Sequence, residues 1–302
     1  MKMSHKRSNS GRAIRATRSA GIVLALQLLT GVSLVSVISL GIDTMPAQAA
    51  SSTEVTNPLL LDKGSWKDLS GDIIGDVSPG DAKGIIRLDA PYRAHDAATV
   101  PIQLRQPSPT APIITTATLI IDENPAPVAA VMAFGPAMHP LDIEVRVRVN
   151  LYSNVRLVAE TGQGPVMTGR FVKASGGCSA PATKNPELAL STMGQIRAKH
   201  FDSKIAQSNQ RREAQIMIRH PNYSGLQRDQ ITQLFIAAHF VDHIEVRQGD
   251  DLLFTVDGGI SLSENPVIRF AYTDNGSTDL TIRAEDTEGN SWEQSIAKDP
   301  AS

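Results

Sequence analysis

Apolar residues at every second position limit how this chain can fold more than any other feature of its sequence. In residues 143–149 each odd position is Ile or Val and each even position is Glu or Arg, and the odd positions of 155–159 are likewise apolar. This period of two predicts strands with one buried face. Turn signals separate further candidate strands at 85–88, 100–104 and 116–121. Several short strands without a long helix predict a β-sandwich over residues 65–178.

A second group of predicted strands fills residues 213–298. Two pairs of strands flank turn signals, 244–247 and 253–256 around Gly249-Asp250-Asp251, and 280–283 and 291–294 around residues 287–290. Short loops of this composition are typical of β-hairpins. We therefore expect an all-β chain with two sandwich domains, each large enough to bury its own core.

Residues 179–212 differ from both groups. Asn185-Pro186-Glu187 combines an N-cap residue, a proline at the first helical position and an acid in the first turn, which together indicate the start of a helix. Leu188, Leu190, Met193 and Ile196 would share this short helix, although Gly194 weakens it. The region is predicted to be a linker with one short helix.

Residues 1–49 have the composition of a signal peptide. Six Lys and Arg precede an apolar run over residues 20–42, and Ala47-Gln48-Ala49 supplies the small residues of a cleavage site. A basic head, an apolar middle and an A-x-A end predict export, here to the periplasm, followed by cleavage. The alternative is an uncleaved anchor, because the run is just long enough to span a bilayer.

The charge left after cleavage excludes some classes of partner. The remaining chain has 23 basic and 30 acidic residues, a net charge of about −7. An acidic chain argues against nucleic acid and against anionic lipid as partners. No later stretch is long and apolar enough to cross a membrane, so no membrane contact is expected after cleavage.

The single cysteine, Cys178, is the main candidate for chemistry. An exported protein enters an oxidising compartment, yet one cysteine forms no internal disulfide. Gly176 and Gly177 precede it and allow unusual backbone angles, and Ser175 and Ser179 keep the segment polar. We expect an exposed, nucleophilic thiol on a flexible arm that contains Gly176 and Gly177. The alternative is a buried cysteine that acts as a small apolar residue.

The first predicted domain contains a series of short motifs. In chain order these are Leu88-Asp89-Ala90-Pro91, Val100-Pro101-Ile102, Asp122-Glu123-Asn124-Pro125-Ala126-Pro127, Phe134-Gly135-Pro136 and Gly176-Gly177-Cys178. Together they resemble SoxY, the sulfur-carrying subunit of the periplasmic sulfur-oxidation system. The second domain resembles the partner subunit SoxZ, in Ile218-Arg219-His220-Pro221, Gly225-Leu226, Ala238-His239-Phe240 and Ser263-Glu264-Asn265-Pro266. A chain with both resembles the fused SoxYZ-like carriers associated with quinoprotein alcohol dehydrogenases.

The resemblance implies immunoglobulin-like domains that pair with each other, and a carrier that is not an enzyme. Cys178 would hold a sulfur-containing intermediate while partner redox enzymes of sulfur oxidation, or a quinoprotein dehydrogenase with its cytochrome c, process it. Two departures are visible: Ser179-Ala180-Pro181 replaces the second Gly-Gly pair, and the arm does not end the chain. The alternative function is a docking protein for the dehydrogenase, in which the cysteine is incidental.

Other reactive residues form no complete pattern. His239 and His243 are four residues apart and would share a face as metal ligands only on a helix, whereas their surroundings lead into a strand. A cysteine-dependent enzyme needs a base near the thiol, and the nearest histidines along the chain are His139 and His200. We therefore predict no metal site, no cofactor and no catalytic residues.

Overall fold

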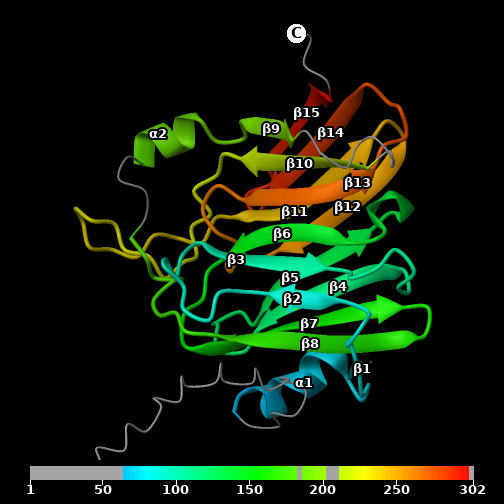
Figure 1. Ribbon diagram of the computed structural model, residues 1–302. Helices are drawn as coiled ribbons and strands as arrows, with labels where there is room; N and C mark the ends of the chain where they lie inside the picture. Colours follow the sequence, from blue (N-terminus) through cyan, green and yellow to red (C-terminus); the bar gives the residue numbers. More distant parts are fainter. Residues whose placement is uncertain (1–63, 182–185, 202–210, 299–302) are drawn as a thin grey trace, which may run out of the picture. The chain divides into compact units, whose positions relative to one another are not determined.

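A computed structural model describes residues 64–181, 186–201 and 211–298. The predicted signal peptide, residues 1–49, lies outside the described residues. In the described part the strands form two sheets (Figure 1). The larger sheet has nine strands, in the order β1 (Gly80–Asp81), β8 (Gly164–Val172), β7 (Ser153–Thr161), β4 (Ile114–Ile121), β5 (Val128–Phe134), β12 (Asp251–Gly258), β11 (Val241–Gln248), β14 (Asp279–Asp286) and β15 (Ser291–Ala297).

The second sheet has six strands. Their order is β2 (Arg87–Asp89), β3 (Val100–Arg105), β6 (Asp142–Val147), β13 (Val267–Thr273), β10 (Arg211–Ile218) and β9 (Ile196–Phe201). Neighbouring strands in both sheets are antiparallel except β1 and β8. The all-β prediction is confirmed.

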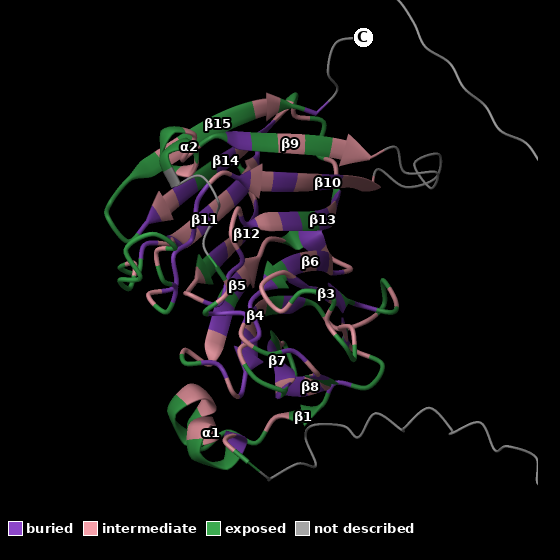
Figure 2. Cartoon of the chain, turned by 90° about the vertical axis from the view of Figure 1, so that its left-hand side faces the viewer, coloured by how far each residue is buried: buried purple, intermediate pink, exposed green. Residues whose placement is uncertain are grey.

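The two halves of the chain, residues 64–178 (the first half) and 196–298 (the second half), join edge to edge in both sheets. β5 pairs with β12, from Phe134 opposite Phe254 to Ala130 opposite Gly258. β6 pairs with β13 in the same way in the other sheet. One hydrophobic cluster therefore runs through both halves, rather than the two separate cores that we expected. Figure 2 shows the buried positions along the strands of both halves.

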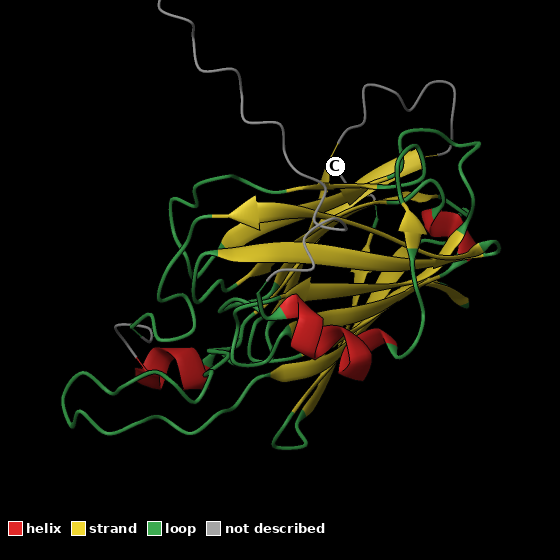
Figure 3. Ribbon diagram, turned by 90° about the horizontal axis from the view of Figure 1, so that it is seen from below, coloured by secondary structure: helices red, strands yellow, loops and turns green. Residues whose placement is uncertain are grey.

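Within the described residues, three helices lie outside the strand layers (Figure 3): α1 (Trp66–Ile74), the short 3-10 helix η2 (Pro136–Met138) and α2 (Pro186–Ser191). The sequence did not predict α1. Its Trp66 is buried beneath the guanidinium of Arg156, at 4.5 Å from the ring centre, and Arg156 also binds Asp122 inside the protein. None of the helices in the described residues has the length and apolar character needed to span a bilayer.

The predicted helix after the cysteine segment is shorter than expected. α2 begins at Pro186, as the capping pattern predicts, but it ends at Ser191. Ile196 was wrongly placed on this helix, because it begins β9 and pairs with Ile218. Gly194 explains the break: it has a φ of +81°, and its N–H donates to the carbonyl of Arg219. Residues 203–210 of the predicted linker lie outside the described ranges, and Arg211 and Arg212 belong to β10.

Candidate functional site

The cysteine segment is docked along the residues that follow β6. The N–H of Gly176 donates to the carbonyl of Asn150 at 2.7 Å, and the N–H of Gly177 donates to the carbonyl of Val149 at 3.1 Å. The two segments run in opposite directions, so the next residue of the arm, Cys178, lies beside Arg148. The structure thus brings the thiol next to a charged residue that the sequence analysis did not single out.

Glycine at position 177 allows the segment to approach the sandwich closely. A Cβ atom at this position would lie 2.1 Å from the carbonyl oxygen of Ala97 and 2.7 Å from that of Val149. Both atoms are backbone, so neither moves aside easily. The preceding Gly176 has a φ of +78°, which other residues rarely adopt. In this structure Gly176 and Gly177 allow the segment to pack tightly against the sandwich. Their predicted role in a flexible arm stays a prediction.

The loop between β10 and β11, residues 219–240, covers the cysteine segment from the second half; it extends to the left in Figure 1. The hydroxyl of Ser224 donates to the carbonyl of Cys178, and the amide of Gln227 donates to the carbonyl of Ala180 at 3.0 Å. We call this loop the cover loop. At its far end it exposes large apolar side chains, those of Ile231, Leu234 and Phe235.

The expected exposure of the thiol is wrong for this structure, because Cys178 is 0% exposed. Ser175 and Ser179 are exposed as predicted, but they flank a residue that points inward. The sequence near Cys178 gives no sign of this burial, since the covering Ser224 is 46 positions away. The Gly-Gly pair was the available signal, since glycines permit close packing as well as mobility. Cys178 belongs to neither aliphatic cluster of the described residues.

The surroundings of the thiol are charged. Burial raises the pKa of Cys178, and the guanidinium of Arg148 opposes this in part. Arg148 itself is 1% exposed, and its Nη1 donates to the carbonyls of Ile260 and Leu262 from the second half. Glu264 lies close enough to interact with Arg148, and burial raises the pKa of its carboxyl group. The docked thiol is therefore protonated at neutral pH and a weak nucleophile.

Asn124, from one of the motifs noted in the sequence, holds the backbone on which the cysteine segment rests. Its amide nitrogen donates to the carbonyl of Arg148 at 2.8 Å and to the hydroxyl of Ser261 at 2.9 Å, while its oxygen accepts the N–H of Asn150 at 2.8 Å. All of these bonds are inside the protein, where an unpaired polar group is costly. Asn124 thus links the two halves directly beneath Arg148.

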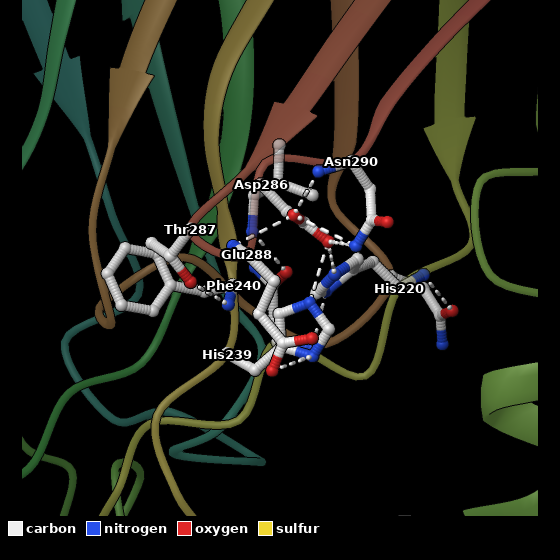
Figure 4. A network of polar contacts seen from close by, with 10 residues as sticks. His220, His239, Phe240, Asp286, Thr287, Glu288 and Asn290 are labelled. Atoms are coloured by element: carbon white, nitrogen blue, oxygen red, sulfur yellow. Dashed lines mark hydrogen bonds and ion pairs between the residues drawn. The ribbon is translucent and has the colours of Figure 1, made fainter.

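A buried network closes the base of the cover loop (Figure 4). His220 and His239 stand at its two ends, and the Nε2 atoms of both contact Asp286 Oδ2, at 3.3 Å and 2.6 Å. Asn290 donates to the same carboxylate from its side chain and its backbone. Burial alone would raise the pKa of Asp286, but the donors of Asn290, His239 and His220 hold it well below its usual range. The sequence analysis missed this cluster, because its members come from distant segments.

The hydrogen bonds of the network favour a structural role over metal binding. The N–H of Asn222 donates to Nδ1 of His220 at 3.0 Å, so the neutral ring carries its proton on Nε2. That proton points at Asp286 and occupies the position of a metal bond. His243, which is four residues from His239 in the sequence, lies outside this cluster and contacts Asp257 at 2.6 Å. We interpret the cluster as the lock that fixes the cover loop over Cys178.

Comparisons with known proteins find a different family match for each half of the chain. The family model described as "Sulfur oxidation protein SoxY" matches residues 71–178 and ends at the cysteine, and the model described as "Sulphur oxidation protein SoxZ" matches residues 196–297. A solved structure of the sulfur carrier protein SoxY from Chlorobium limicola f thiosulfatophilum is 23% identical and has a TM-score of 0.31; the match covers 36% of this chain and 91% of that one. No curated protein matches the chain. Residues 71–178 thus belong to the SoxY family and residues 196–297 to the SoxZ family, which is a fused SoxYZ-like layout in one chain.

Proposed function

We propose that this protein is an exported, periplasmic carrier that holds a sulfur-containing intermediate covalently on Cys178 for partner redox enzymes. One observation carries the proposal. The chain has a single cysteine, which is the last residue of the SoxY match and lies where the two halves meet beneath the cover loop. A carrier needs one sulfur with no second thiol that would displace the cargo as a disulfide. Partner enzymes perform the redox steps, and the carrier itself is not an enzyme.

The docked conformation would be the resting state of such a carrier. The buried, protonated thiol is protected from adventitious oxidants. Loading then requires the segment around Cys178 to leave its place, which breaks the two hydrogen bonds from Ser224 and Gln227 of the cover loop. In the open state the thiolate attacks the sulfur of a donor, and the leaving group of the donor takes up the electron pair.

A second function is favoured by the burial of the thiol. A cysteine with no exposed surface and a raised pKa is typical of an inert residue. In that case the protein docks onto a periplasmic quinoprotein dehydrogenase and its cytochrome c, and the thiol has no chemical role. Both functions are compatible with the same folded structure. They differ in whether Cys178 becomes covalently modified.

Intact-mass measurement of protein purified without reductant from the periplasm tests the carrier proposal. Wild-type protein is exposed to sulfide, thiosulfate or polysulfide together with an extract that contains the partner redox enzymes, which act as the oxidant. The added mass is located by peptide mapping. We expect sulfur adducts on Cys178, and loss of sulfur-dependent electron transfer in Cys178→Ser. An unmodified Cys178 under all donors, with a Cys178→Ser variant that still supports electron transfer from the dehydrogenase, would establish the docking function instead.

A further inference from the structure

Arg148 is held rigidly at the position next to the thiol. It follows directly after β6, and its N–H donates to the carbonyl of Ser261 at 2.7 Å. Its side-chain Nη1 binds carbonyls of the second half, and its own carbonyl accepts from Asn124. Because the bonds of Gly176 and Gly177 run antiparallel to residues 149–150, Cys178 lies opposite Arg148. The guanidinium and the thiol are both buried at the junction of the halves, and they interact electrostatically.

The charge of Arg148 is incompletely compensated. Its side-chain hydrogen bonds in the described ranges go to neutral carbonyls, and its buried Nε has no partner there. No ion pair joins it to a carboxylate within those ranges either. Glu264 is the acid that interacts with it, without forming a salt bridge to it, and burial raises the pKa of that carboxyl group. A buried guanidinium is normally paired, since removing an ion from water is costly.

We infer that Arg148 forms an anion subsite that holds the negatively charged end of a sulfur cargo on Cys178, a persulfide (Cys–S–S⁻) or an S-thiosulfonate (Cys–S–S–SO₃⁻). The inference rests on the proposed carrier function and names the class of cargo that the docked state accepts. The unmodified thiol is neutral and adds no negative charge beside the guanidinium, whereas both adducts add one negative charge beyond the sulfur. Arginine suits this task because its planar fork binds oxyanions with two hydrogen bonds.

Two reagents load Cys178 with adducts that differ in charge. With tetrathionate, the thiolate attacks a central sulfur, forms Cys–S–S–SO₃⁻ and expels thiosulfate, which carries away the electron pair of the broken S–S bond. With methyl methanethiosulfonate, the same attack forms the neutral Cys–S–S–CH₃ and expels methanesulfinate. Each reagent is its own oxidant, and intact mass confirms complete loading before any comparison.

Thermal unfolding and amide hydrogen exchange of the two adducts of the full chain test the inference. We expect the anionic adduct to melt at least about 2 °C above the neutral one, a shift that a favourable ion pair produces in a protein of this size. We also expect the amides of Gly176 and Gly177 to exchange more slowly in the anionic adduct. Equal melting temperatures and equal exchange in the wild-type protein would overturn the inference, without the need for a variant.

Two variants assign the effect to Arg148. Arg148→Met is expected to abolish the difference between the adducts. Since that variant loses buried hydrogen bonds and is at risk of not folding, Glu264→Gln serves as the second variant. It removes the competing carboxylate, so the difference should grow; an unchanged or smaller difference contradicts the inference. Failure of the carrier function is seen separately, as an unloaded Cys178 in protein from the periplasm, whatever the adducts do.

Discussion

Replacing Gly177 by alanine should release the cysteine segment from the sandwich. The new Cβ atom would lie 2.1 Å from the carbonyl oxygen of Ala97, a distance that real contacts do not reach. Since the atoms that the Cβ meets belong to the backbone of Ala97 and Val149, the segment has to leave its place. We therefore expect the thiol to become exposed while the two sheets, whose contacts do not involve residue 177, stay folded.

The size of the effect follows from the bonds that the docked segment makes. The N–H groups of Gly176 and Gly177, the hydroxyl of Ser224 and the amide of Gln227 supply four hydrogen bonds. At about 0.5–1.5 kcal/mol each, they stabilise docking by about 2–6 kcal/mol. Because 1.4 kcal/mol corresponds to a factor of ten, the reaction of Cys178 with iodoacetamide should accelerate at least about 25-fold. The exposed thiol also regains a lower pKa, which increases the rate further.

The assay is the rate of alkylation at pH 7.5, followed by intact mass, with unfolding by urea measured in parallel. Gly162→Ala is the matched control, because nothing lies within 4 Å of the added Cβ atom. Its alkylation rate should equal that of the wild type. A folded Gly177→Ala variant with the wild-type rate would refute the reasoning, since the segment would then accommodate the methyl group without leaving its site.

Three further predictions concern the surroundings of the thiol. Ser224→Ala should accelerate alkylation of Cys178 by about 2–10-fold with little loss of stability, since it removes one hydrogen bond of the cover loop; an unchanged rate would show that the loop does not control access. Asn124→Ala should lower the free energy of unfolding in urea by about 2–3 kcal/mol, because it leaves several buried groups unpaired, and a loss below about 0.5 kcal/mol would contradict the structural role. Stability should also fall as the pH drops below about 6.5. Burial holds the pKa of His220 below its ordinary value, opposed in part by Asp286 and assisted by the neighbouring ring of His239, so the unfolded chain takes up a proton that the folded chain does not. The His220 contribution is thus fully present above pH 6.5 and is lost towards its folded pKa, and His220→Gln should flatten the melting temperature between pH 7 and pH 5.

The sequence predicted strands best where one face is buried and the other is not. The hairpin around Gly249 corresponds to β11 and β12, and the alternation over 143–149 corresponds to β6 and the residues that follow it. β5 was missed because its residues, Val128–Phe134, are apolar on both faces. β8 was missed because it begins with Gly164-Pro165, which are typical of a turn.

The candidate site was predictable only in part, since its components are far apart in sequence. The reactive atom itself, in Cys178, stands out as the one cysteine of the chain. Its burial depends on Ser224 and on the backbone near Ala97, whose positions relative to it no local pattern reveals. The pairing of Arg148 with the thiol likewise arises from the register of the docked arm. The sequence therefore identifies the reactive residue of the site, whereas the burial of that residue depends on the tertiary structure.

The central claim is that Cys178 holds a sulfur-containing intermediate covalently. Mass spectrometry of the protein isolated from cells that oxidise sulfur compounds tests this claim most directly. We predict a population with extra mass at this residue, removable by a reductant and absent from Cys178→Ser. A homogeneous, unmodified thiol in cells under active sulfur oxidation would contradict the account.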